Sequence, residues 1–362
     1  MSLNAKKLLD DKVYDRIMKS ANFEEGDRVP IWDYIDNSFV YDYFSSKDEP
    51  FEQRTVKVFH GLGIDLCRGF TEPILAELDG TKRQFENKQQ VISGQTVWTE
   101  RPIKTIEDLK KFNIDLVKKE WIYDKWIPNL KRMQEIFAPY TMFVPGVGVG
   151  FDDLYSVLMD LELFSFAIYD EPEHIKKILN RINENRVQLV QAIIKENLSP
   201  IFFTWSDIAY KGSTMFSKKI LQEFFIPCLK NICKPLKEAG IKIIFHSDGN
   251  VMNILDDMID AGIDGLNPIE PIAGMDIGYL KKKYYRKLIL VGNVDCSQVL
   301  PFGTKKDLIN ATKECIRQAS IGGGHFIGSS SEIVPSTPLE NVLTFYNACH
   351  KYGKYPINLQ MS

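Results

Sequence analysis

The sequence has little of what would tie it to a membrane, to nucleic acid or to an oxidising compartment. Its six cysteines are scattered, and only Cys228 and Cys233 lie close together, at a spacing that fits no common zinc or redox signature. It has no run of about 18 apolar residues and no basic-then-apolar leader. The 45 Lys and Arg residues nearly balance 48 Asp and Glu residues, which leaves no basic footprint for nucleic acid. We therefore expect a cytoplasmic protein that binds neither membranes nor nucleic acid.

Eight short runs of β-branched or aromatic residues recur along the chain, each ending in polar residues and followed by a helical pattern. Of the 362 residues, 44% are apolar and 26% are charged, as in ordinary globular proteins. Short apolar runs that alternate with helices indicate parallel strands buried on both faces. The runs are residues 29–35, 64–70, 140–146, 200–207, 242–249, 262–268, 288–295 and 324–331.

Helix and turn signals fill the intervening segments. Residues 173–196 have apolar residues at a helical spacing, and Ser217 is a suitable N-cap for the helix that follows it. Thr337, which precedes a proline, is suited to begin the last helix. Residues 89–102 depart from this order of strands and helices. Their apolar and polar residues alternate as in a β-hairpin that turns near residues 93–94.

Eight strand–helix units with one hairpin insertion predict an α/β fold, a single (β/α)8 TIM barrel. We expect one domain over residues 1–362, with a helical extension at 1–28 and the barrel at 29–350. A doubly wound open sheet is the alternative, but the first strand lacks the Gly-rich phosphate turn of many such sheets.

Polar residues follow these runs, and in a barrel they would meet at the mouth formed by the C-terminal ends of the strands. The mouth would be acidic on balance, which suggests a metal, a cationic group or raised carboxyl pKa values. The expected residues are Asp33, Asp36, Asp65, Arg68, Asp207, Tyr210, Lys211, His246, Asp248, Asn267, Glu270, Asn293, Asp295, Ser331 and Glu332.

His246 and Asp248 carry the clearest chemical signal. Of the five histidines, only His246 ends a strand-like apolar run. In an extended His-x-Asp segment both side chains lie on one face, which suits a metal bound by one imidazole and one carboxylate. The alternative is a hydrogen-bonded histidine at a strand end, followed by a plain Asp-Gly turn.

Three other segments leave two interpretations open. Prolines flank Glu270, which suits a stiff loop as well as a ligand site. The glycine before Asn293 permits close backbone approach to either a ligand or a facing strand. The loop that contains Ser331 and Glu332 could bind an anion through hydroxyls and helix amides, or could only cap a helix.

Several segments together resemble the uroporphyrinogen decarboxylase superfamily, which includes corrinoid-dependent methyltransferases. They are FHSDGN, GLNP, GNVD, residues 145–160, residues 207–225 and the closing residues 335–342. Their order and spacing are specific although no single motif is decisive, and the similarity spans nearly the whole chain. The resemblance implies a (β/α)8 barrel, in agreement with the strand count, and a homodimer.

The superfamily's zinc methyltransferases imply a metal site that this chain only partly matches. In those proteins a His-x-Cys ends the fifth strand and a second Cys precedes the closing motif. Here His246 matches the histidine, whereas Asp248 and Ser331 replace the cysteines. The loss of both thiolates predicts a harder, more oxygen-rich site, completed by Glu332 or Asp207.

The resemblance to true uroporphyrinogen decarboxylases is weaker at the chemistry. Asp65 matches their catalytic aspartate and Tyr155 their tyrosine, but their histidine falls on Ser331. Their arginine-rich stretch corresponds to residues 32–38, which carry Asp33 but no arginine. A substrate with many carboxylates would be repelled there.

Our first hypothesis is methyl transfer between a small methylated molecule and a corrinoid carried by a partner protein. A divalent metal, zinc first among the candidates, would be bound by His246 and Asp248 and act as a Lewis acid. Asp207 or Glu332 would supply or take a proton. Other substrate-binding candidates are Trp32, Asp33, Arg68, Lys211, Asn267, Glu270, Asn293 and Ser331.

Three further possibilities belong beside this hypothesis. If the donor is a methylated amine, Trp32, Tyr34 and Trp205 could hold its cation, although core packing is the alternative role for these rings. The chain could instead be a metal-free decarboxylase in which Asp65 is central, with Tyr155 nearby. It could also be a non-catalytic barrel that binds a corrinoid protein or a tetrapyrrole.

Overall fold

The computed structural model describes residues 5–69, 83–85, 89–92, 95–98 and 101–360, and its fold is α/β. Parallel strands form a two-stranded sheet, β1-β5, and a five-stranded sheet in the order β10-β9-β8-β7-β6, while β2, β3 and β4 form a separate antiparallel sheet. The strands are β1 Leu66–Cys67, β2 Arg83–Phe85, β3 Gln89–Ile92, β4 Gln95–Trp98, β5 Met142–Phe143, β6 Ile201–Trp205, β7 Lys242–His246, β8 Gly265–Asn267, β9 Ile289–Val291 and β10 His325–Phe326.

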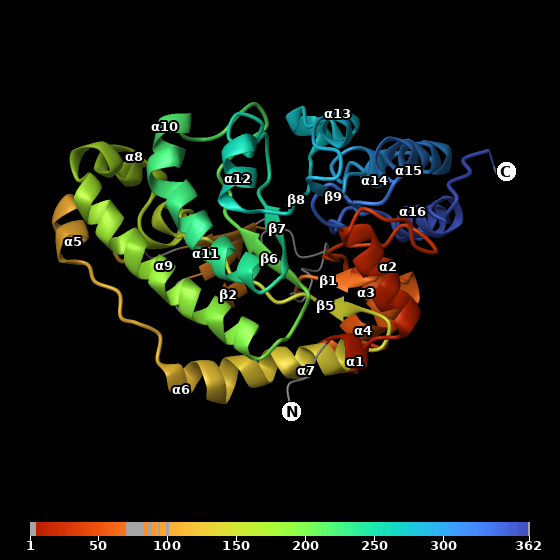
Figure 1. Cartoon of the computed structure of the whole chain (residues 1–362), viewed down its shortest axis with the longest axis horizontal. Helices are drawn as coiled ribbons and strands as arrows, with labels where there is room; N and C mark the ends of the chain where they lie inside the picture. The colour runs from red at the N-terminus through yellow and green to blue at the C-terminus, as the bar shows by residue number, and fades with distance from the viewer. Residues whose placement is uncertain (1–4, 70–82, 86–88, 93–94, 99–100, 361–362) are drawn as a thin grey trace.

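Helices occupy most of the segments between the parallel strands, and Figure 1 shows them around a central group of strands. None of the described helices is both long enough and apolar enough to pass through a bilayer. The α-helices are α1 Ala5–Leu8, α2 Asp11–Ala21, α3 Ser38–Phe44, α4 Phe51–Leu62, α5 Ile106–Lys111, α6 Lys119–Trp121, α7 Ile127–Phe137, α8 Leu161–Asp170, α9 Pro172–Lys195, α10 Lys218–Ile220, α11 Ile226–Glu238, α12 Leu255–Ala261, α13 Ile277–Lys283, α14 Val299–Phe302, α15 Lys305–Ala319 and α16 Leu339–Tyr352. The other helical segments are the π-helical turns η2 Ile122–Trp126, η3 Leu154–Leu158 and η4 Leu221–Phe225 and the 3-10 turn η5 Pro271–Ala273.

Single parallel bridges connect the two parallel sheets to each other and to the first predicted strand. These bridges are too short to merge the two sheets, but they join the edges of the sheets to each other and to residues 31 and 32. The bridges are Ile31–Ile327, Trp32–Leu66 and Gly146–Phe203.

Most of the local predictions from the sequence are confirmed. Each predicted run after the first contains one parallel strand, and α9 falls within one residue of the predicted helix. The antiparallel pair of β3 and β4 confirms the hairpin, although residues 93–94 lie outside the described residues. The Ser217 hydroxyl accepts from the Ile220 N–H at 3.4 Å, as an N-cap does. Thr337 is not a cap, because the backbone at Pro338 is still extended (ψ 139°) and α16 begins one residue later.

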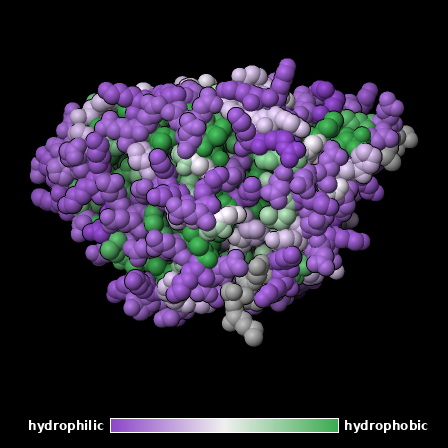
Figure 2. Space-filling model, in the orientation of Figure 1, coloured by the Kyte–Doolittle hydropathy of each residue, from purple (hydrophilic) through white to green (hydrophobic). Residues whose placement is uncertain are grey.

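Side chains of the parallel strands alternate between two cores. One set packs against the surrounding helices, as Phe202 and Phe245 do. The other set, which includes Trp32 and Phe203, forms an inner cluster together with Val13 and Ile17 of α2. This alternation is what strands buried on both faces require. The outer surface is mostly hydrophilic in the view of Figure 2, with separate hydrophobic patches.

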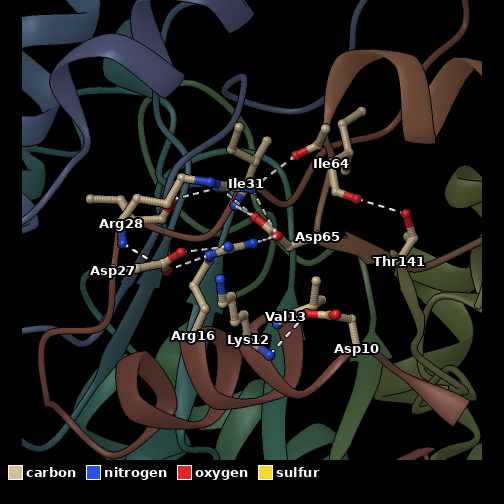
Figure 3. Close-up of polar contacts among 12 residues, drawn as sticks. Asp10, Lys12, Val13, Arg16, Asp27, Arg28, Ile31, Ile64, Asp65 and Thr141 are labelled. Carbon is tan, nitrogen blue, oxygen red and sulfur yellow. Dashed lines mark hydrogen bonds and ion pairs between the residues drawn. The ribbon is translucent and has the colours of Figure 1, made fainter. Parts of the chain in front are cut away.

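A buried ion-pair cluster attaches α2 to the start of β1. The Asp65 carboxylate is 1% exposed and accepts from Arg16 Nη1 at 2.6 Å, from Arg28 Nη1 at 2.7 Å and from the Ile31 N–H at 2.7 Å. Asp27 binds the other side of the Arg16 guanidinium, with two contacts of 2.6 Å. Figure 3 shows both arginines directed at Asp65. The cluster therefore fixes α2 against the N-terminal end of the strands.

We expect Asp65→Asn to lower the free energy of unfolding by about 3 kcal/mol, because breaking a buried pair leaves an uncompensated charge. Denaturant-induced unfolding would measure the loss. The control is Asp15→Asn, which removes a surface carboxylate that pairs with Lys19 at 2.8 Å. Because that pair is exposed to solvent, its loss should change stability much less. Equal losses in the two variants would contradict the structural role of Asp65.

Candidate functional site

The candidate site lies at the C-terminal ends of β6 and β7. His246 is the last residue of β7, and Asp248 follows two residues later, while Asp207 lies two residues beyond β6. His246 Nε2 is 3.7 Å from Asp248 Oδ1 and 4.0 Å from Asp207 Oδ1. The three ligand atoms all lie within 4.8 Å of one another. The imidazole is nearly buried, whereas both carboxylates are about half exposed.

The parallel register of β7 and β8 determines which nitrogen of His246 faces the carboxylates. It pairs His246 with Asn267, and His246 Nδ1 lies 2.6 Å from Asn267 Oδ1. Because an amide oxygen can only accept, this contact is a hydrogen bond in the tautomer whose Nδ1 carries the proton and donates to Asn267 Oδ1. In that tautomer Nε2 keeps its lone pair and points at Asp207 and Asp248. Asn267, predicted as a substrate-binding residue, contacts the imidazole of His246 and so orients that ring.

This donor set fits a divalent metal ion. Ligand atoms around a tetrahedral ion with bonds of about 2.0–2.2 Å lie roughly 3.3–3.6 Å apart, slightly closer than the separations seen here. One imidazole nitrogen and two carboxylate oxygens leave a fourth position open, as in catalytic zinc sites. A metal-binding histidine is neutral, and the pKa of His246 is shifted in the direction that favours this form. Burial lowers its pKa, and Arg68 adds to this effect, although Asp248 and Asp207 oppose it.

A glycine brings the two carboxylate-bearing loops together. Gly249 has φ +85°, and a Cβ there would lie 2.6 Å from Tyr210 N and 2.7 Å from Ala209 C. Any side chain would therefore push the loop that carries Asp207 away from Asp248. The Asn250 N–H also donates to the Tyr210 carbonyl at 2.9 Å, so the two loops are hydrogen-bonded at this point.

Hydrogen bonds from Tyr155 and Ser206 also support the loop that carries Asp207. The Tyr155 hydroxyl donates to the Asp207 carbonyl at 2.5 Å, so Tyr155, a predicted catalytic residue, supports the loop through its backbone. Ser206 donates to the Asp152 carboxylate at 2.7 Å. Burial, with help from Asp153, raises the pKa of Asp152 to about 7. Sequence reasoning missed Asp152, whose signal is an acidic pair within the otherwise apolar segment 145–160.

Several other predicted residues surround the metal-binding group. Ser331 donates to Asp248 Oδ1 at 3.3 Å, and Arg68 donates to the Ser331 carbonyl at 3.3 Å. Burial, followed by the charge of Asp36, raises the pKa of Glu332 to about 7. Asp248 also acts on Glu332, so the two carboxylates lie in one electrostatic environment.

Loops after β7, β8 and β9 form the remaining side of the site. Glu270 accepts from the Gly249 N–H at 2.6 Å, and burial raises its pKa while exposed Lys211 opposes the rise. Asn293 is buried and donates to the Ile269 carbonyl at 3.1 Å, which ties the loop after β9 to the loop after β8. These contacts favour loop positioning over direct ligand binding for Glu270 and Asn293.

Three predicted residues are not part of this group. Asp65 precedes β1 and lies at the opposite end of the strand, neutralised by two arginines, so the expectation that it lines the mouth is corrected. Trp32 is 3% exposed and packs in the inner cluster against Phe203 and Phe326. Asp33 is buried and accepts from Tyr346 and from both polar hydrogens of Ser329, which makes it a structural anchor.

The fold matches that of a solved structure described as a methyltransferase from Methanosarcina mazei. The TM-score is 0.69, with 20% sequence identity, and the alignment covers 94% of this chain and 98% of the other. At this identity the match shows a common fold.

Curated relatives match over shorter stretches. A methylated-thiol–coenzyme M methyltransferase of Methanosarcina mazei is 26% identical over 38% of this chain and 35% of its own length. A methylcobamide:CoM methyltransferase of Methanosarcina acetivorans is 22% identical over 52% of each chain. A uroporphyrinogen decarboxylase of Actinobacillus succinogenes is 22% identical over 52% of this chain and 51% of its own. The chain thus aligns with between about a third and a half of the length of these relatives.

The family comparison covers a larger part of the sequence. Residues 93–352 match the model of the family named uroporphyrinogen decarboxylase (URO-D). This match extends over well more than half of the chain, and it includes both carboxylate-bearing loops and the histidine between them. The chain belongs to the uroporphyrinogen decarboxylase family.

Proposed function

We propose that this protein is a metal-dependent methyltransferase that moves a methyl group between a small methylated molecule and a corrinoid carried by a partner protein. The observation that carries the proposal is the convergence of His246, Asp207 and Asp248, with Nε2 directed at both carboxylates. Two curated relatives named as methyltransferases support the reaction class, and the name of one includes methylcobamide.

We further propose that the strands close into a single (β/α)8 barrel, with residues 1–362 as one domain. In support, the bridges of residues 31 and 32 lead from β10 to β1, and the bridge of residue 146 leads from β5 to β6. Together with the assigned sheets, these bridges give an uninterrupted order of parallel neighbours. The homodimer and the cytoplasmic location stay predictions.

Three side chains would hold the metal. His246, Asp207 and Asp248 supply one nitrogen and two oxygens, and zinc accepts such a set. When bound, the ion supplies Lewis acidity toward a sulfur, oxygen or nitrogen atom of a small substrate. Asn267 keeps the imidazole oriented by accepting from Nδ1, as the outer partners of metal-binding histidines do.

Glu332 is a candidate proton donor, and the charge of Asp248 contributes to its raised pKa. Its pKa of about 7 leaves a substantial protonated fraction near neutral pH, which suits a general acid. Its carboxyl could give a proton to a heteroatom that leaves without its methyl group. Asp207 is already assigned to the metal, so it is the weaker candidate for this role.

The Asp65-centred decarboxylase now has less support than the methyltransferase. The carboxylate of Asp65 is committed to Arg16 and Arg28 at the N-terminal end of β1. A group so fully neutralised and buried has no access to a substrate at the other end of the strands. Similarity to a decarboxylase of Actinobacillus succinogenes reflects the shared family.

The reaction can be tested with free cobalamin in place of the partner. Zinc-loaded protein should accelerate methyl transfer from methylated thiols, ethers or amines to cob(I)alamin that a chemical reductant keeps reduced, followed by the absorbance change as methylcob(III)alamin forms. His246→Ala should lower the rate by about a hundredfold or more, since metal activation is worth several kcal/mol. The control is His174→Ala, which changes a surface histidine beside Glu171. Equal rates in wild type and His246→Ala, or no bound metal in wild type, would contradict the proposal.

The role of Asn267 can be tested by zinc affinity. Asn267→Leu removes the acceptor from Nδ1 and should weaken zinc binding by about 10–100-fold. Asn267→Asp keeps an acceptor and should bind zinc as well as wild type or better. Competition with a chromophoric chelator would give the dissociation constants. If both variants weaken zinc binding equally, the Nδ1 hydrogen bond does not position the histidine.

The raised pKa of Glu332 predicts a pH dependence of stability in metal-free protein. The carboxyl ionises near 4.5 in the unfolded chain and near 7 in the folded one, so folded protein binds more protons between these values. Its stabilising contribution is therefore present below about pH 4.5 and is lost as the pH rises through 7. Glu332→Gln should reduce this loss by on the order of 3 kcal/mol, measured as unfolding free energy against pH. Parallel curves for the two proteins would show that Glu332 titrates normally.

A further inference from the structure

A cavity of about 390 Å³ lies between α9, the π-turn η3 and residues 112–118. Residues 112–118 run beside α9 on their way from α5 to α6 (Figure 1). The side chain of Asn185 ties them to α9, because its Oδ1 accepts from the Val117 N–H at 2.8 Å and its Nδ2 donates to the Asp115 carbonyl at 3.0 Å. The volume falls within the range of small-molecule sites, about 300–1,000 Å³.

The lining of this cavity is mostly apolar but includes one buried donor without a partner. Ile182 and Leu189 of α9 form one wall, and Val157 of η3 lies on another. Within the described part of the chain, Arg186 Nε is buried and makes no hydrogen bond, whereas its Nη2 donates to Asp153 Oδ2 at 2.9 Å. A buried donor that is left unpaired costs free energy. A molecule that brings an acceptor to Nε would remove this cost.

The ion pair of Arg186 determines which charge a ligand can carry. Asp153 also lines the cavity, so its carboxylate already neutralises the guanidinium. A ligand carboxylate would approach the like charge of Asp153 and would lose its hydration among apolar side chains. A neutral carbonyl oxygen can accept the same hydrogen bond without either cost. The cavity therefore favours an uncharged molecule with a carbonyl oxygen and an apolar body.

The wall around η3 connects the cavity to the loop that carries Asp207. Asp153 faces the cavity, whereas its neighbour Asp152 accepts from the Ser206 hydroxyl at 2.7 Å. Two residues after Asp153, the Tyr155 hydroxyl donates to the Asp207 carbonyl at 2.5 Å. Neighbouring side chains of one short segment thus contact the cavity on one side and the loop on the other. If this segment opened, both the cavity and the support of the loop would be lost.

We propose that this cavity binds a small uncharged molecule through a carbonyl oxygen that accepts from Arg186 Nε, and that the bound molecule stabilises the loop that carries Asp207. The ligand requires the closed form of η3, because the cavity loses a wall when this turn opens. A ligand that binds only the closed form suppresses opening about tenfold at ten times its dissociation constant. The cavity is separate from the metal-binding group, so the inference does not depend on the proposed reaction.

Binding is tested by calorimetric titration of the protein, without added metal, with cyclohexanecarboxamide and with cyclohexanecarboxylate. Wild type should bind the amide with a dissociation constant below about 1 mM, and the carboxylate at least about tenfold more weakly. Arg186→Lys keeps a cation for Asp153 but removes Nε, so it should weaken amide binding about tenfold. Val117→Phe should weaken it as strongly by filling part of the cavity. The control is Val299→Phe, at a half-buried valine that lines a different cavity.

The connection to the loop is tested by hydrogen exchange followed by mass spectrometry. At ten times the dissociation constant of the amide, peptides from η3 and from residues 205–208 should exchange up to about tenfold more slowly. Tyr155→Phe lacks the hydroxyl that supports Asp207, and residue 155 is not part of the cavity lining. This variant should therefore bind the amide as wild type does but show less protection of residues 205–208.

The inference is overturned if wild type does not bind the amide below about 1 mM, because water would then be sufficient to satisfy Arg186 Nε. It is also overturned if the carboxylate binds as tightly as the amide, or if Arg186→Lys and Val117→Phe both bind the amide as wild type does. Unchanged exchange of residues 205–208 at saturating amide would likewise reject it. None of these measurements uses zinc, so they leave the metal-dependent reaction to be decided separately.

Discussion

The parallel register of β6, β7 and β8 is the constraint on which the site depends. It pairs Trp205 with His246, and His246 with Asn267, at neighbouring strand ends. One of these pairs places the amide oxygen on Nδ1, and the loops that follow the strands carry the two carboxylates. A shift by one residue would turn His246 toward the outer helices, because side chains alternate along a strand. The chemistry therefore depends on backbone pairing more than on any single side-chain contact.

The sequence predicted the strands and the central histidine because both depend on local patterns. Apolar runs that alternate with helices locate β6 and β7, and His246 ends one of them. Asp248 follows at a spacing that keeps it on the same face. Asp207 was correctly predicted to lie near His246 and Asp248, because parallel strands bring their C-terminal ends to one edge. The His-x-Asp spacing already suggested a metal, whereas the corrinoid came from the family resemblance alone.

The remaining site residues could not be placed from the sequence, because their positions depend on where each strand begins and on long-range partners. Asp65 occurs in a predicted run but precedes the two paired residues of β1, so it falls at the other end. Its arginines come from α2 and from residue 28, and no local pattern connects them. The direction of Trp32 likewise follows from bridges to residues distant in sequence. The contact between Asn267 and His246 could not be predicted either, because it depends on the register of β7 and β8.

The packing of α2 determines the side from which a molecule can reach His246. Val13 and Ile17 of this helix share the inner cluster with strand residues, and the Asp65 ion pairs hold the helix in place. That end of the strands is filled by protein. Any compound that approaches His246 must come from the rim where the loops lie, and it must leave by the same side. Under the proposed reaction, the small substrate and the bulky corrinoid protein would reach the site from the same side. The fold would therefore constrain the order in which the two bind and are released.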